Sequence, residues 1–202
     1  MTSALGESRT LGAMTIRTVV VVAALVAAGG LASADPEPEP APRERVGLEL
    51  GGGLWGGNIS CNGSDCSGFR AAGGLSGHIG YNFSERLGAL VDLWAMTSNK
   101  DNASITFVTA TIDLRLWLAP QVWVQGGLGN GHAVISVLGF SGRGDDVPVA
   151  ELAAGLELVR HRSYALSVAA KLAQGTSAGD NGSGAQTGRM VGLGAELTFF
   201  SH

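Results

Sequence analysis

Histidine and serine side chains that could act together as a base and a nucleophile occur at two places in the sequence. His161 and Ser163 are separated by one residue, a spacing at which an imidazole could take the proton from the serine hydroxyl. The second group follows a glycine-rich run and consists of His132, Ser136, Asp145 and Asp146. Both groups lie among residues that favour turns and loops. We therefore expect solvated polar side chains at both places and predict no catalytic residue.

A larger set of ionisable residues recurs at alternate positions within segments that are otherwise apolar. Successive side chains of a β-strand point to opposite faces, so this set shares one face. If that face is buried, its charges must be paired, because breaking a buried ion pair is strongly destabilising. We predict a structural network of ion pairs, to which Arg70 and Arg86 would also contribute. Its members are Glu49, His78, Asp92, Asp113, Arg115, Glu151, Glu157, Lys171 and Glu196.

The sequence predicts neither a metal site nor a cofactor. No group of histidines and cysteines has the spacing of a metal site, and the run from Gly126 to Gly131 lacks the GxGxxG pattern and the following helix of a dinucleotide site. The net charge of −4 gives no basic surface for nucleic acid. Charged residues make up only 15% of the 202 residues, which is low for a soluble enzyme.

The N-terminal region has the features of a secretory signal. Arg17 precedes an apolar run that begins at Val19, and Ala32-Ser33-Ala34 has the A-x-A form of a cleavage site. We predict a cleaved signal peptide over residues 1–34, with Met14 as a possible true start. The alternating prolines that follow keep a chain extended, so residues 35–45 are predicted to be a periplasmic spacer.

Two cysteines, Cys61 and Cys66, lie close together in a segment rich in asparagine, glycine and serine. In an exported chain such a pair favours a disulfide bond that closes a surface loop. Metal binding is the alternative, but apart from Asp65 no histidine or acidic cluster accompanies the pair. We predict the disulfide.

Beyond residue 45, apolar and polar residues alternate in eight segments, the pattern of half-buried β-strands. Three of the connections are short, at residues 82–85, 119–120 and 160–162, whereas the others, at 56–68, 97–104, 136–148 and 174–187, are long and polar. Parity breaks near Asn130 and His132, where we expect a bulge or the edge of a membrane. Alternating short and long connections are typical of membrane barrels. We predict an all-β fold, a closed eight-stranded antiparallel transmembrane β-barrel spanning residues 46–202.

The C-terminal segment carries a more specific pattern, with a glycine, alternating apolar positions and closing aromatics at Gly194, Leu197, Phe199 and Phe200. This pattern resembles the assembly signal of outer-membrane barrels. Over residues 46–200 the chain is similar to the small OmpA- and OmpX-type barrels. The resemblance implies the outer membrane of a Gram-negative bacterium, contact with outer-membrane lipid, lipopolysaccharide and the assembly machinery, and an interior plugged by ion pairs.

Three functions are compatible with this reading. The first is a structural or surface-interaction role without catalysis, with the long loops meeting an external partner that the sequence does not identify. The second is a lipid A-modifying barrel enzyme, since some small barrels of this kind use a His-x-Ser pair, as in His161 to Ser163. The third is a soluble, secreted ligand-binding barrel of the lipocalin type. A wide pore is not expected, because side chains fill an eight-stranded barrel.

Overall fold

The computed structural model describes residues 45–62, 70–100, 103–137, 140–177 and 186–201. The predicted signal peptide and all but the last residue of the predicted spacer lie outside these ranges. No helix within them has the length and hydropathy of a membrane-spanning helix. The strands are β1 (Gly47–Asn62), β2 (Arg70–Asn82), β3 (Leu87–Lys100), β4 (Ala103–Ala119), β5 (Val122–Val137), β6 (Phe140–Arg143), β7 (Val147–Arg160), β8 (Tyr164–Ser177) and β9 (Gln186–Ser201).

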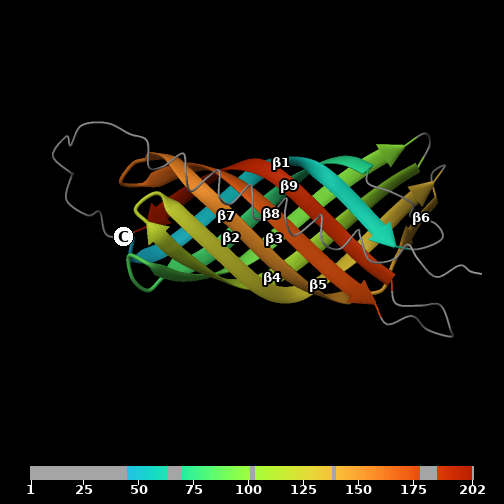
Figure 1. Cartoon of the computed structure of the whole chain (residues 1–202), viewed down its shortest axis with the longest axis horizontal. Coiled ribbons are helices and arrows are strands. Elements are labelled where there is room, and N and C mark those ends of the chain that lie inside the picture. The colour runs from blue at the N-terminus through green and yellow to red at the C-terminus, as the bar shows by residue number, and fades with distance from the viewer. Residues whose placement is uncertain (1–44, 63–69, 101–102, 138–139, 178–185, 202) are drawn as a thin grey trace, which may run out of the picture. The chain divides into compact units, whose positions relative to one another are not determined.

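The strands form one closed antiparallel barrel (Figure 1). Consecutive strands pair from β1 to β5 and from β7 to β9, and β5 also pairs with β7. Because β1 pairs with β9, the sheet has the order β4-β3-β2-β1-β9-β8-β7-β5 and returns to β4. Short β6 pairs only with the end of β5 and adds a hairpin to the rim. The predicted eight-stranded antiparallel barrel is confirmed, and β6 is an addition within the segment predicted as the loop 136–148.

The alternation in sequence sorts side chains between the outside and the interior of the barrel. On β4, the side chains of Ile112 and Leu114 are 72% and 59% exposed. The side chains that alternate with them in the chain, Asp113 and Arg115, are almost fully buried. The other barrel strands repeat this alternation, with aliphatic side chains outside and polar, charged or tryptophan side chains inside. Backbone groups are paired on both sides of every barrel strand, as a closed sheet allows.

The interior also holds four tryptophans, Trp55, Trp94, Trp117 and Trp123, none more than 4% exposed. Glycines on neighbouring strands make room for these rings. A Cβ added at Gly155 would lie 2.3 Å from Cζ2 of Trp123, so only glycine leaves the ring its place. The large rings therefore fill the interior of this narrow barrel, and the glycines beside them leave the space that the rings occupy.

One prediction about the connections is wrong. The loop predicted at 97–104 is largely strand, because β3 runs to Lys100 and β4 begins at Ala103. Thr97 and Thr106 pair there through their hydroxyl groups at 2.9 Å, so polar residues with high strand propensity continue the ladder beyond the apolar band. β1, β5, β8 and β9 are also longer than expected at this end of the barrel, which is the end opposite the short turns.

Of the two explanations offered for the break near Asn130 and His132, the bulge is wrong, since β5 pairs with β4 and β7 there without a shift in register. The edge of the membrane stays a prediction. The parity holds as well, and both side chains lie on the outer face near the rim. The register shifts instead lie between Trp117 and Ala119 on β4 and between Glu157 and Val159 on β7. Both are beside short turns, where an extra residue helps a strand to bend.

Candidate functional site

Lys171 on β8 is the centre of one group of charges inside the barrel. Its Nζ lies 2.9 Å from both carboxylate oxygens of Asp92 on β3 and 3.3 Å from Oε1 of Glu151 on β7. The ammonium also lies 5.1 and 5.4 Å from the ring centroids of Trp55 and Trp94. Two carboxylates and two π-faces therefore replace the water that the buried ammonium has lost.

Arg115 on β4 is the centre of a second group. Its Nε and Nη2 donate to Oε1 of Gln125 at 3.0 and 2.8 Å, and its Nη1 lies 3.5 Å from Oε1 of Glu49. Glu196 on β9 is farther away, with Oε2 at 3.9 Å from Nη2. The guanidinium lies 4.3 Å from the ring centroid of Trp123. The planar group thus links β1, β4, β5 and β9 across the barrel.

A third group of charges lies at the end of the barrel that carries the short turns. Its central residue, Arg45, was not among the predicted site residues. Arg45 is only 5% exposed, and its Nη2 lies 3.1 Å from Oε2 of Glu157. It also donates to the carbonyl groups of Glu85 and Pro120, and it lies 4.7 Å from the ring centroid of Trp117. Arg45 was assigned to the spacer because the alternation of apolar and polar residues begins only at Val46.

The structure places all nine residues of the predicted interior network inside the barrel and buries them. Of the two additional partners expected, Arg86 is exposed in the β2–β3 turn, and the side chain of Arg70 lies outside the described residues. His78 on β2 contacts Thr198 on β9, with 3.3 Å between Nε2 and Oγ1. Further polar contacts bring Asp113 to Thr111 and Gln125, and Glu49 to Asn82.

Neither of the two histidine–serine groups forms a catalytic pair in the structure. His161 stacks on Tyr164, with 5.1 Å between the ring centroids, in the exposed turn between β7 and β8. His132 contacts Asp146, with 3.4 Å from Nδ1 to Oδ1, whereas Ser136 lies about 13 Å farther along the extended strand. Asp146 also accepts a hydrogen bond from Arg143, which lowers the pKa of this exposed carboxyl below its usual range.

The residues of the predicted assembly signal lie on β9, next to β1. Leu197 and Phe199 point outward, 40% and 52% exposed, from the strand that closes the barrel. Gly194 has a local role: an added Cβ there would lie 2.5 Å from Cδ2 of Trp55, so this glycine seats an interior ring. Phe200 is half-buried opposite Glu49.

Cys61 lies near the end of β1, and Cys66 lies outside the described residues, so the disulfide stays a prediction. We expect both cysteines to resist alkylation in denatured, non-reduced protein from the cell envelope. After reduction both should react. Because the closed loop is short, replacing both with serine should lower the free energy of unfolding by no more than about 3 kcal/mol and leave the barrel assembled. Two free thiols in the non-reduced protein would contradict the prediction.

Solved structures of bacterial surface proteins resemble this barrel. Neisserial surface protein A gives a TM-score of 0.58 at 12% identity, over 76% of this chain and 97% of its own. The attachment invasion locus protein Ail of Yersinia pestis gives 0.49 at 17% identity, over 75% and 99%. The outer membrane protein OprG of Pseudomonas aeruginosa gives 0.43 at 13% identity, over 81% and 100%. No protein-family model and no curated protein matches the chain.

The closed strand order and the likeness to neisserial surface protein A lead to one conclusion about architecture. The chain has the fold of the small eight-stranded outer-membrane β-barrels.

Proposed function

We propose that this chain is an integral protein of the bacterial outer membrane with a structural or surface-interaction role, and that it is not an enzyme. The observation that carries the proposal is the distribution of side chains over the barrel. Leu54, Ile112, Leu128 and Leu193 are each more than 60% exposed on its outside, while the nine ionisable residues of the interior network are buried inside. In water such a surface would aggregate, whereas in a bilayer it matches the hydrocarbon.

This distribution also favours a membrane barrel over the soluble lipocalin type. A barrel that binds an apolar ligand in water needs an apolar cavity inside and a polar surface outside. Here the interior is occupied by ion pairs and four tryptophans, and the exterior is aliphatic. The same packing supports a closed barrel over a wide diffusion pore. Outer-membrane lipid, lipopolysaccharide and the assembly machinery are the partners that such a location requires.

The lipid A-modifying alternative has less support from the geometry. His161 and Ser163 lie at the end with the short turns, where the ring of His161 stacks on the ring of Tyr164. In the proposed orientation that end faces the periplasm, away from the outer leaflet. Deleting the protein should therefore leave the mass spectrum of lipid A unchanged, and a lost or gained acyl chain would favour the enzyme instead.

The proposed orientation follows from the topology of the barrel. The short turns at residues 83–86, 120–121 and 161–163 share one end with the start of β1 and the end of β9 (Figure 1). In outer-membrane barrels the short turns and both termini are periplasmic. The opposite rim, with the β5–β6 hairpin, then meets the outside of the cell.

Two single cysteines test this orientation, both introduced in a Cys61→Ser, Cys66→Ser background. Ser141 on β6 and Ser163 in the β7–β8 turn are both exposed, so Ser141→Cys and Ser163→Cys are matched in chemistry and differ in the end they mark. We expect an impermeant maleimide to label position 141 on intact cells and position 163 only after the outer membrane is opened. The reverse pattern would show an inverted barrel. Recovery of the chain without detergent would contradict the membrane location.

A further inference from the structure

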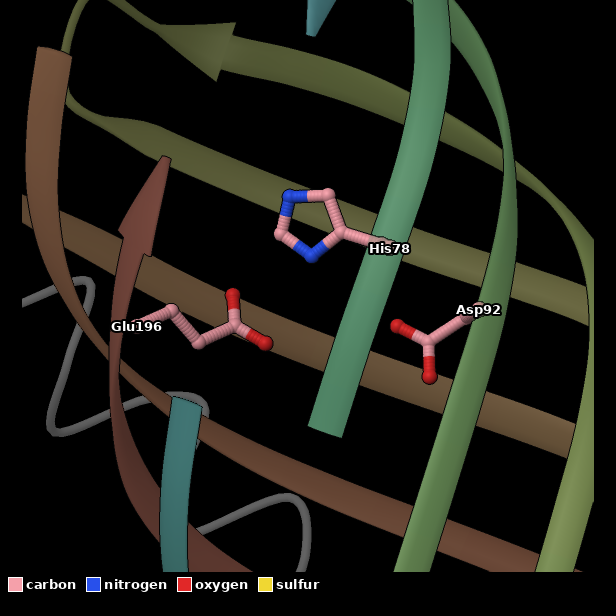
Figure 2. Close-up of side chains that lie close together, drawn as sticks. All are labelled: His78, Asp92 and Glu196. Atoms are coloured by element: carbon pink, nitrogen blue, oxygen red, sulfur yellow. The ribbon is translucent and has the colours of Figure 1, made fainter. Parts of the chain in front are cut away.

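His78, Asp92 and Glu196 point toward one another inside the barrel from three different strands (Figure 2). His78 lies on β2, Asp92 on β3 and Glu196 on β9. One ring nitrogen of the histidine and one oxygen of each carboxylate lie within 4.8 Å of one another. We call these residues the interior triad. An imidazole and two carboxylates are a ligand set that divalent transition metal ions take in proteins.

The wall of the barrel leaves space for the triad at two glycines of β1. Gly51 pairs with His78 on one side, and Gly53 pairs with Glu196 on the other. A Cβ added at Gly51 would lie 2.4 Å from Nε2 of His78, and one added at Gly53 would lie 2.9 Å from Cγ of Glu196. Side chains at either position would displace the triad, so the close approach of its members depends on these glycines.

Two polar atoms of the triad have no hydrogen-bond partner among the described residues. They are Nδ1 of His78 and Oε1 of Glu196, on side chains that are 3% and 1% exposed. The other carboxylate oxygen of Glu196, Oε2, lies 3.9 Å from Nη2 of Arg115, which is beyond hydrogen-bond distance. Buried polar groups are rarely left without a partner, since each lost hydrogen bond to water is unfavourable. Here two such atoms belong to the same small cluster.

The charges around the triad also require a counter-charge. Among the described residues, five carboxylates lie in the middle of the interior, from Glu49, Asp92, Asp113, Glu151 and Glu196, and the lysine and arginine side chains among them are Lys171 and Arg115. Arg45 lies at the turn end with Glu157. The excess of negative charge must be offset by bound protons or by a further cation, because unpaired buried charges are too unfavourable.

We propose that the interior triad binds one divalent transition metal ion, with Zn²⁺ as the probe. The two orphaned atoms become ligands, and the ion offsets most of the excess charge. Asp92 can serve both the ion and Lys171, because its oxygens together offer about four lone-pair positions. Zn–N and Zn–O bonds are about 2.0–2.2 Å, so the three side chains need only to close toward a common centre. The ion would fasten β9 to β2 and β3.

A second acidic cluster, made of Asp92, Asp113 and Glu151, is the competing position. It has only oxygen ligands, and Lys171 lies 3.3 Å from one of them and 2.9 Å from another. Oxygen-only sets suit Mg²⁺ and Ca²⁺, whereas the imidazole of the triad selects for transition metals. Competition between Zn²⁺ and Mg²⁺ therefore distinguishes the two positions.

The test uses the full chain folded in detergent, stripped of metal with EDTA and dialysed against Zn²⁺, with bound metal measured by mass spectrometry. We expect stoichiometric Zn²⁺ that millimolar Mg²⁺ does not displace. His78→Gln and Glu196→Gln should each weaken binding by more than about 100-fold, because loss of a direct ligand exceeds the effect of losing a second-shell partner. Asp113→Asn is the matched control, a buried carboxyl in the same interior outside the triad, and should bind as the parent does.

Several results would overturn the proposal. They are the absence of stoichiometric Zn²⁺ in the parent protein, displacement by Mg²⁺, and equal losses in Asp113→Asn and Glu196→Gln. Each variant is first checked for the folded barrel by circular dichroism and by its migration in unboiled gels. Because Glu196→Gln preserves the shape of the side chain, it keeps the test decisive if His78→Gln does not fold. If none of the folded proteins binds metal, bound protons alone offset the excess negative charge of the interior.

Discussion

Replacing Lys171 with methionine is expected to lower the free energy of unfolding by about 3–5 kcal/mol, because it leaves buried carboxylates without their cation. Asp92 loses both of its 2.9 Å contacts with Nζ, and Glu151 loses its contact at 3.3 Å. Methionine preserves most of the volume of the side chain, so the loss reports the charge and not a cavity. A reversible urea titration of the barrel in lipid vesicles measures the change.

The matched control removes the charge from the partners as well. Lys171→Met combined with Asp92→Asn and Glu151→Gln should recover most of the lost stability, since neutral groups of the same shape no longer need an ammonium. A loss below about 1 kcal/mol in the single variant would contradict the role of Lys171 as the centre of this group. So would a triple variant that is no more stable than the single one.

Replacing Leu193 with arginine is expected to lower the free energy of unfolding in a bilayer by about 2–4 kcal/mol, the cost of a cation on the lipid face at the midplane. Leu193 on β9 is 62% exposed on the outside of the barrel, between Gly56 on β1 and Ala170 on β8. The same titration in vesicles measures the change.

The control is the same substitution at a different depth. Leu118 is 63% exposed beside the short turn between β4 and β5, so Leu118→Arg should lower the stability by only about 0–1 kcal/mol, because the side chain reaches the interface. Thr198→Ser, on the interior face, should be almost silent. Equal effects of arginine at positions 193 and 118 would contradict the proposed placement of the barrel in the bilayer.

The two faces of the barrel could be predicted from sequence because they depend on a local rule. In β4, Ile112 and Asp113 are neighbours in the chain, and period-two alternation alone assigns them to opposite sides. The eight segments and their order follow from the same alternation. The ends of the strands do not, because polar residues such as Thr97 and Thr106 are equally compatible with a loop and with a ladder beyond the apolar band.

The contacts of the interior depend on closure and could not be predicted in this way. Arg45 meets Glu85, Pro120 and Glu157, which are separated from it by 40, 75 and 112 positions in the chain. The interior triad likewise combines a hairpin pair, His78 and Asp92, with Glu196 from the last strand. No spacing in the sequence marks such a group, since the distances between its members are set by how many strands close the barrel.

The pairing of β1 with β9 has a consequence for how the molecule forms. Leu48 lies opposite Ser201, so contacts between the two ends of the domain are part of the native ladder. A pairing this distant in sequence must close a very large loop, and long-range β pairing of this kind forms slowly. Until the last strand arrives, β1 also presents an unpaired edge to other chains, and such edges promote aggregation. We therefore expect the step that pairs β1 with β9 to limit the rate of folding, and the open sheet that precedes it to be the form most prone to aggregation.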